Sequence, residues 1–178
     1  MRLYLLRHAS VDERYTGCYN GHIDISLSDM GNEEAAQAAV KLQDIEFDAV
    51  YCSDLARCRQ TLQYMGAANT VFDERLREKS WGRAEGMGYD EICEKFGVAY
   101  ESFAQFIDAI GGESIAEFEM RVGEFFDELK AKGHSNTLVV THGGVIKTLL
   151  AKHRNLGLEE AFGLDIPYAS ITIIEDFV

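Results

Sequence analysis

Proline is nearly missing from this 178-residue sequence, which contains only Pro167, and no stretch is rich in Gly and Ser or in charges of one sign. Linkers between domains are usually made of such stretches, so we predict a single domain over residues 1–178. No motif recurs at a fixed period, which argues against a repeat protein. A chain of this length can bury a large apolar core without disulfide bonds or metal ions.

Cysteine is also scarce and is not arranged for a metal site or a disulfide framework. Cys18, Cys52, Cys58 and Cys93 form no C-x-x-C pair, and they do not combine with histidines at zinc-finger spacing. We therefore expect reduced thiols in a cytoplasmic protein. We see no secretory leader, and no apolar run approaches the roughly 18 residues that a membrane-spanning helix needs.

Basic residues are few compared with acidic ones. The sequence has 17 Lys and Arg against 30 Asp and Glu, which gives a formal net charge of −13. Such an acidic surface repels nucleic acid and anionic membranes, so neither is an expected partner. A cluster of arginines in this chain would have to be held together against the field of the whole protein. Any such cluster is therefore a candidate site.

Short apolar runs alternate with amphipathic helical patterns along the chain. Predicted strands cover residues 3–7, 49–52, 71–72, 137–141 and roughly 169–174. The first predicted helix begins after Ser28, and the second covers residues 55–65. One or two helices lie within residues 89–110, with a break near Gly97. A further helix runs from a capping box at Ser114 to Gly133, and the last spans residues 143–154. This alternation predicts an α/β fold with three layers, in which helices cover both faces of a mostly parallel sheet. Residues 88–112 read as a helical insertion, and residues 73–88 as a loop.

Three of the predicted strands are followed by histidine or arginine. His8 follows the first strand, Arg57 the second, and His142 the strand before the last. Open α/β sheets bind their ligands beyond the carboxyl ends of the strands, so three such endings predict one shared site. For His8 the alternative is a histidine that closes its strand by hydrogen-bonding a loop carbonyl.

These residue types suit a phosphoryl group. The guanidinium groups of Arg7 and Arg57 bind phosphate oxygens with fixed charge and bidentate geometry, and a helix that begins at Gly143 presents free backbone N–H groups. A neutral imidazole can attack phosphorus, and nearby arginines disfavour its protonated form. His8 and His142 could instead hold a metal ion, but neighbouring guanidinium groups would repel it. We therefore expect neither a metal nor a cofactor.

Five blocks of sequence span nearly the whole chain. They are Arg7-His8-Ala9; Gly21, Asp24, Leu27 and Gly31; residues 53–61; residues 75–78 with 81–86; and residues 112–114 with 141–144. Together and in this order they resemble the motifs of the histidine phosphatase superfamily, the phosphoglycerate-mutase-like proteins. The resemblance implies a phosphatase in which His8 is the nucleophile that becomes phosphorylated. It also implies that Arg7, Arg57, His142 and the Gly143 backbone bind the phosphoryl group.

The resemblance assigns the remaining site residues with alternatives. Glu78 has the family spacing of the general acid, which later acts as the base that activates water. Glu85 is the rival for that role because flanking glycines would let its loop fold inward. Asn20 and Gly21 stand where the family contacts substrate. Arg14 replaces a family asparagine and either adds positive charge to the site or lies in solvent.

Within this family the sequence favours hydrolysis over phosphoryl transfer. A mutase needs a cover that keeps water away from its phosphorylated intermediate, and the chain ends directly after its last predicted strand. Its type resembles the α-ribazole phosphatases of cobalamin assembly, so α-ribazole 5′-phosphate is the specific candidate among small phosphomonoesters. The alternatives are a phosphoglycerate-type phosphomutase and a non-catalytic phosphate-binding module. We expect a monomer or a homodimer.

Overall fold

The computed structural model describes residues 1–97, 103–157, 160–161 and 163–178. Its sheet has the strand order β3-β2-β4-β1-β5. The strands are β1 (Arg2–Arg7), β2 (Ala49–Cys52), β3 (Val71–Phe72), β4 (Asn136–Thr141) and β5 (Ile171–Ile174). Neighbouring strands from β3 to β1 are parallel, and β5 runs antiparallel to β1 at the edge. The prediction of a mostly parallel sheet is confirmed.

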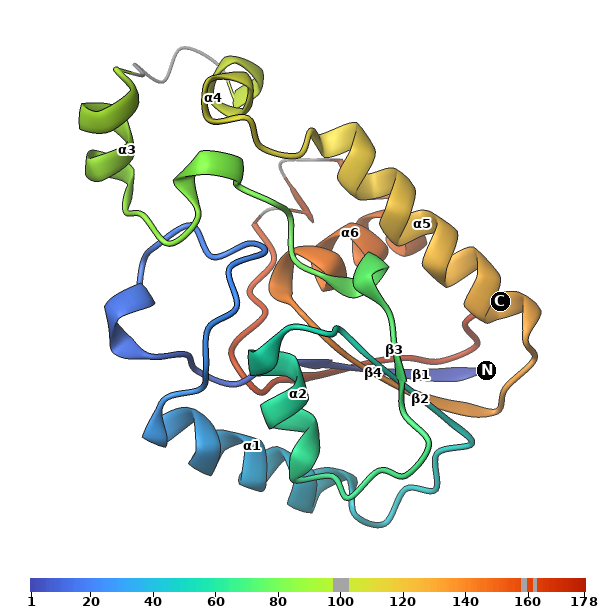
Figure 1. The fold of residues 1–178 in the computed structure, drawn as a ribbon. Helices are drawn as coiled ribbons and strands as arrows, with labels where there is room; N and C mark the ends of the chain where they lie inside the picture. The colour runs from blue at the N-terminus through green and yellow to red at the C-terminus, as the bar shows by residue number, and fades with distance from the viewer. Residues whose placement is uncertain (98–102, 158–159, 162) are drawn as a thin grey trace.

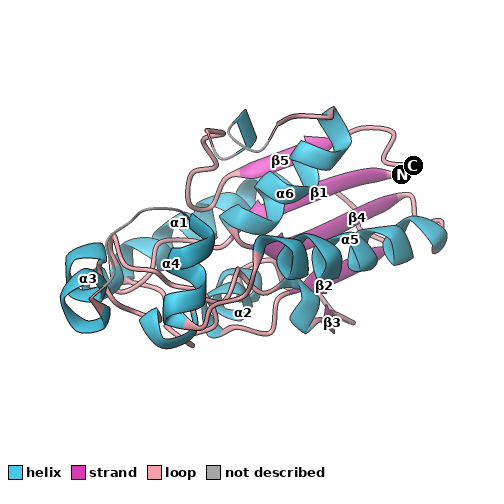
Figure 2. Ribbon diagram, turned by 90° about the horizontal axis from the view of Figure 1, so that it is seen from above, coloured by secondary structure: helices cyan, strands magenta, loops and turns pink. Residues whose placement is uncertain are grey.

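Helices cover both faces of this sheet. They are α1 (Asp29–Leu42), α2 (Ala56–Gln63), α3 (Tyr89–Phe96), α4 (Phe103–Ile110), α5 (Ile115–Ala131) and α6 (Gly143–Arg154). In Figure 1, α1 and α2 lie below the sheet and α5 and α6 above it. In Figure 2, α3 and α4 lie beyond the carboxyl ends of the parallel strands. Within the described ranges, no helix has the length and apolar character that crossing a bilayer requires.

Alternating residues of β1 supply the two halves of the core. Leu3 and Leu5 pack with apolar side chains of α5 and α6, whereas Tyr4 and Leu6 pack with those of α1 and α2. Successive side chains of a strand point to opposite faces, so a continuous apolar run is buried on both sides only when both faces are covered. Each fully buried leucine contributes about 1.5–3 kcal/mol to stability. This packing confirms the predicted three-layer fold.

The predicted helix signals act as expected. The Ser28 hydroxyl accepts from the Gly31 N–H at 3.0 Å and begins α1, and Ser114 and Glu117 form the capping box of α5. Gly97 has a φ of +64°, a left-handed conformation that suits glycine, and it ends α3. Local sequence therefore determines where these helices begin and end.

Two boundary predictions need correction. β5 begins at Ile171 rather than near residue 169, because Ala169 has a φ of +52° and interrupts the extended backbone. Residues 73–88 are not a featureless loop, since they contain 3-10 turns at Glu74–Leu76 and Gly82–Ala84. These turns fix the path of the chain past the carboxyl ends of the strands.

Candidate active site

Two histidines meet because β1 and β4 are parallel neighbours. Arg7 pairs with Thr141, so the next residue of each strand, His8 or His142, leaves the sheet at the same level. The His8 N–H donates to the Thr141 carbonyl at 2.8 Å, and the two rings lie edge to face with centroids 5.0 Å apart. Only 6% of His8 is exposed, and His142 is fully buried. The predicted convergence of these strand endings is therefore present in the fold.

Arg57 joins the histidines from the first turn of α2, which follows β2. The residue is 1% exposed, and its Nε donates to His142 Nδ1 at 3.2 Å. The Nη atoms donate to the carbonyls of Ile23, at 2.9 Å, and Gly21, at 2.6 Å. Burial lowers the pKa of Arg57 below its usual value. The side chain thus ties the loop of residues 20–23 to the histidine pair.

Both ring nitrogens of His142 have protein partners. Because Nδ1 accepts from Arg57, the proton of the neutral ring is on Nε2, which donates to Ser53 Oγ at 2.9 Å. Burial, followed by the charge of Arg57, lowers the pKa of His142 well below its usual value. In this arrangement His142 orients the Arg57 guanidinium. A direct contact of His142 with substrate stays a prediction.

His8 has a single defined tautomer. Its Nδ1 lies 2.8 Å from the carbonyl oxygen of Ala9, and because a carbonyl can only accept, Nδ1 carries the proton and Nε2 the lone pair. Burial, then the charges of Arg57 and Arg7, lower the pKa of His8 well below its usual value. The bond to a loop carbonyl is therefore compatible with a nucleophile, because it leaves Nε2 unprotonated.

We expect both buried histidines to stay neutral below pH 6.5, the usual histidine pKa. A histidine whose folded pKa is depressed binds its proton first in the unfolded chain, so stability is full above pH 6.5 and falls as the pH drops below it. An NMR titration of the ring C2 protons checks the first part, and urea midpoints between pH 7.5 and 5 check the second. A titration of His8 at or above pH 6.5 would contradict the assignment.

Arg7 carries an unpartnered donor toward the start of α6. Its Nη1 donates to the Ile166 carbonyl, and its guanidinium carbon lies 3.9 Å above the ring centre of Tyr168. Its Nε is buried and has no hydrogen-bond partner among the described residues. A Cβ placed on Gly143 would lie 3.4 Å from this Nε. A buried donor beside a helix N-terminus suits a bound anion.

Glu78 also reaches the start of α6. One carboxyl oxygen accepts from the Gly144 N–H at 2.9 Å and the other from the Lys79 N–H at 2.9 Å. A Cβ on residue 144 would lie 2.1 Å from the Glu78 carboxyl, so any other residue there would displace this carboxyl group. The carboxyl group of the candidate acid is therefore bonded to the N-terminus of α6, the helix that begins directly after His142.

Glu85 has a different task. Its two carboxyl oxygens accept four backbone N–H groups, from Gly21, His22, Ile23 and Trp81, at 2.8–3.0 Å. A carboxylate has about four lone-pair sites, and in Glu85 all four accept a backbone N–H. No lone pair is left to carry a proton that could be transferred to substrate. Glu85 therefore shapes the loop of residues 20–23, and this geometry favours Glu78 as the acid.

Of the predicted substrate contacts, Asn20 and Gly21 lie at the site and Arg14 does not. The carbonyls of Asn20 and Gly21 face Arg57, and Asn20 Oδ1 is buried without a hydrogen-bond partner among the described residues. The Arg14 side chain is 75% exposed and pairs with Asp12 of its own turn at 3.1 Å. No contact within the described ranges joins Arg14 to the histidines, which supports the solvent alternative.

Sequence reasoning missed several residues that shape this site. Ser53 accepts from His142, and Tyr168 packs against both Arg7 and His8. Lys79 is 4% exposed, its Nζ lies 4.4 Å from the Trp81 ring centre, and burial lowers its pKa to about 8. Ser53 lies within a recognised block, whereas no motif marks Tyr168. The described residues contain no cluster of three His, Cys, Asp or Glu side chains arranged for a metal ion.

Residues 3–176 match the family model of the histidine phosphatase superfamily, branch 1. The chain belongs to this superfamily. It is therefore a phosphatase, and the family implies a phosphomonoester substrate. The resemblance seen in the five sequence blocks is confirmed.

Relatives of this histidine phosphatase carry different substrate names. A putative phosphoserine phosphatase 2 from Hydrogenobacter thermophilus is 30% identical, over 97% of this chain and 88% of the relative. A broad-specificity phosphatase from Saccharomyces cerevisiae is 31% identical, over 98% and 79%. The crystal structure of the α-ribazole phosphatase from Shigella flexneri superposes with a TM-score of 0.88 at 26% identity, covering 98% of this chain and 90% of that one. This likeness confirms the phosphoglycerate-mutase-like fold.

Proposed function

We propose that this histidine phosphatase hydrolyses small phosphomonoesters through a phosphohistidine on His8, without a metal ion. The observation that carries the proposal is the His8 Nε2 lone pair beside two guanidinium groups and the N-terminus of α6. Arg7 and Arg57 supply the positive charge that phosphoryl transfer requires. A metal ion is not needed in this scheme because the guanidinium groups already neutralise the phosphoryl oxygens.

In the first step, His8 Nε2 attacks phosphorus and forms an N–P bond while the ester P–O bond breaks. The electron pair of that bond goes to the departing alkoxide, which takes the proton of the Glu78 carboxyl. Arg7, Arg57 and the Gly143 N–H hold the phosphoryl oxygens. The position of Glu78 on the Gly144 N–H, at the start of the same helix, supports its assignment.

In the second step, the Glu78 carboxylate takes a proton from water as the water oxygen bonds to phosphorus. The N–P bond breaks, its electron pair returns to Nε2, and inorganic phosphate leaves. Glu78 is protonated again and the cycle closes. Two displacements on the same phosphorus replace a single difficult one.

For the organic part of the substrate we propose a contact surface made by Asn20, Gly21 and the region of α3 and α4. Trp81 packs edge to face with Tyr19, at 4.7 Å, and both pack against an apolar cluster that includes Phe106 of α4. We propose α-ribazole 5′-phosphate as the specific substrate because α-ribazole phosphatases are among the most similar solved structures. The named relatives make O-phosphoserine its main rival.

A panel of phosphomonoesters tests this function. We expect α-ribazole 5′-phosphate, O-phosphoserine, 3-phosphoglycerate and p-nitrophenyl phosphate to differ in kcat/KM, with inorganic phosphate as product and with rates unchanged by EDTA. A rate that collapses with EDTA and returns with a divalent cation would overturn the metal-free scheme. Conversion of 3-phosphoglycerate into 2-phosphoglycerate would indicate the phosphomutase. Phosphate binding without turnover of any ester would indicate the binding module.

A further inference from the structure

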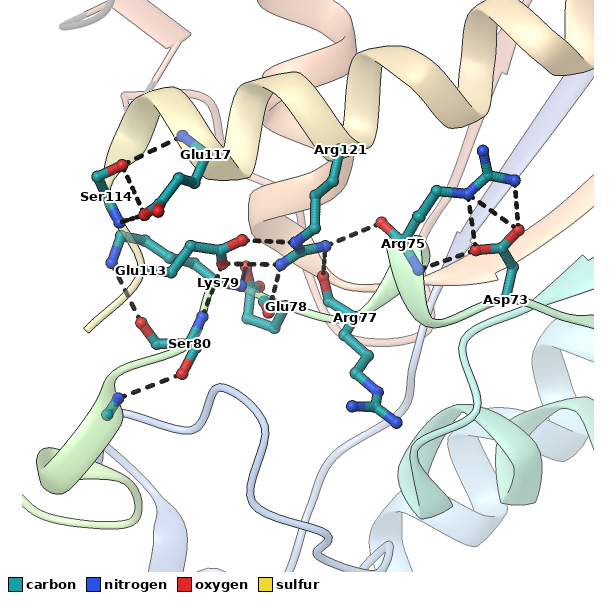
Figure 3. A network of polar contacts seen from close by, with 11 residues as sticks. Asp73, Arg75, Arg77, Glu78, Lys79, Ser80, Glu113, Ser114, Glu117 and Arg121 are labelled. Atoms are coloured by element: carbon teal, nitrogen blue, oxygen red, sulfur yellow. Dashed lines mark hydrogen bonds and ion pairs between the residues drawn. The ribbon is translucent and has the colours of Figure 1, made fainter. Parts of the chain in front are cut away.

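The segment that carries Glu78 is held by one side chain of α5, which lies more than 40 positions further along the chain. Residues 77–80 belong to no strand or helix, so their backbone groups need other partners. Arg121 of α5 supplies them: Nη1 donates to the carbonyls of Arg75 and Arg77, each at 2.8 Å, and Nη2 donates to the carbonyl of Glu78 at 2.9 Å. Figure 3 shows the guanidinium reaching down from α5 to these carbonyls.

The remaining donors of Arg121 bind Glu113. Nε donates to Glu113 Oε1 at 2.6 Å and Nη2 to Oε2 at 2.9 Å, so all five N–H groups of the guanidinium are used. This bidentate pair is largely shielded from water, with side chains 17% and 13% exposed. Burial alone would raise the pKa of Glu113, but the bonds from Arg121 and Ser80 outweigh it and lower the pKa. Glu113 therefore binds the guanidinium as a carboxylate.

Glu113 itself holds the far end of the segment. Its Oε2 accepts from the Ser80 N–H, and its own N–H donates to the Ser80 carbonyl, both at 3.0 Å. The capping box of Ser114 and Glu117 fixes the start of α5 immediately after Glu113 (Figure 3). Every residue from 77 to 80 except Lys79 is thus bonded directly to Arg121 or Glu113 through its backbone.

The geometry of these bonds bears on proton transfer. Arg121 holds the main chain of Glu78, while the Gly144 N–H holds its carboxyl group, so the side chain is fixed at both ends. A displacement of about 1 Å in a catalytic group can cost on the order of 100-fold in rate. A guanidinium fork is required, since lysine cannot supply five donors in one plane.

We propose that Arg121, oriented by Glu113, is the positioning residue for the proton donor Glu78. It does not touch the reacting atoms, and it acts by fixing where the Glu78 carboxyl meets the leaving oxygen. The proposal rests on the proposed function, specifically on Glu78 as the acid. It predicts that replacement of Arg121 lowers kcat/KM most for esters whose leaving group needs a proton, and least for esters whose leaving group does not.

The test compares kcat/KM for two esters in the Arg121→Met variant. An alkyl monoester such as O-phosphoserine loses an alkoxide that needs a proton, whereas p-nitrophenyl phosphate loses a phenolate that leaves without one. Because kcat/KM covers only the steps up to alcohol release, the later hydrolysis of the phosphoenzyme does not affect it. We expect the alkyl ester to lose about 10- to 100-fold more than the aryl ester. An equal loss on both esters would mean a merely structural role and would overturn the proposal.

Three further variants separate the possible failures. Arg75→Met is the matched control, since Arg75 also ties this segment to α5, through Glu128 at 2.9 Å, but its side chain does not bind the backbone near Glu78. It should leave the ratio of the two rates unchanged. Glu113→Gln keeps the shape of the partner without its charge and should give a smaller selective loss. It serves as the test if Arg121→Met proves unfolded by its melting curve.

Glu78→Gln provides the reference. If Glu78→Gln shows the selective loss and Arg121→Met and Glu113→Gln do not, the positioning role is wrong while the proposed function stands. If Glu78→Gln shows no selectivity, the acid assignment itself fails. We expect the double variant that combines Glu78→Gln with Arg121→Met to be no more selective than Glu78→Gln alone. The effects of two substitutions that act through the same group are not additive.

Discussion

Replacement of His8 by alanine is expected to lower kcat/KM by at least about 10,000-fold for every phosphomonoester. In the proposed mechanism the imidazole is the nucleophile, and His142 cannot replace it because both of its ring nitrogens are bonded to protein. His8 is largely buried, with 6% of the residue exposed. The variant should still fold, because the substitution leaves the backbone pairing of β1 with β4 unchanged. Steady-state kinetics and a melting curve measure the two effects separately.

The covalent intermediate gives an independent check on His8. Rapid quenching of the wild type with a ³²P-labelled monoester should trap label that is lost in acid and kept in base, as expected for an N–P bond. The His8→Ala variant should trap none. His134→Ala is the matched control, since His134 lies before β4 and contacts Tyr51 rather than the site. Undiminished hydrolysis or labelling in His8→Ala would remove the nucleophile assignment.

Replacement of Arg57 by methionine is expected to lower both activity and stability. In the proposed mechanism the guanidinium supplies positive charge to the phosphoryl group, so kcat should fall about 100- to 1,000-fold. Its loss also leaves His142 Nδ1 and the carbonyls of Gly21 and Ile23 without their donors in a buried place. Breaking such a network costs about 3–5 kcal/mol in the free energy of unfolding. Urea unfolding and kinetics at a temperature where the variant is folded measure both.

Arg59 offers a matched control on the same helix. Its side chain is 51% exposed and lies 3.9 Å from Asp24, a weak surface pair. Arg59→Met should change the free energy of unfolding by no more than about 0.5 kcal/mol and leave kcat unchanged. If Arg57→Met behaved like Arg59→Met in both measurements, the role of Arg57 as the link between the loop and the histidines would be wrong.

The different roles of Glu78 and Glu85 depend on how the chain packs. Glu78 and Glu85 lie on one polar stretch and look alike in the sequence, where only family spacing favours Glu78. The fold separates them by giving Glu85 four backbone donors and Glu78 a place at the start of α6. Such bonds join segments far apart in the chain, so no local pattern reports them.

The sequence by itself determined the elements and their endings. Apolar runs, the Ser28 and Ser114 caps and Gly97 depend on neighbours a few residues away, so they gave the strands and helices to within two residues at most ends. It also placed His8, Arg57 and His142 directly after strands, where an α/β sheet binds ligands.

Only the tertiary structure decided how these endings combine. The order β2-β4-β1 brings the three residues together, and the path of α5 brings Arg121 and Glu113 onto the segment that carries Glu78. Arg121 gives no sign of this in the sequence, because its partners are backbone carbonyls more than 40 positions away, and carbonyls are the same in every residue. The physical reason is that local preferences form each element, whereas the contacts between elements depend on how the whole core packs.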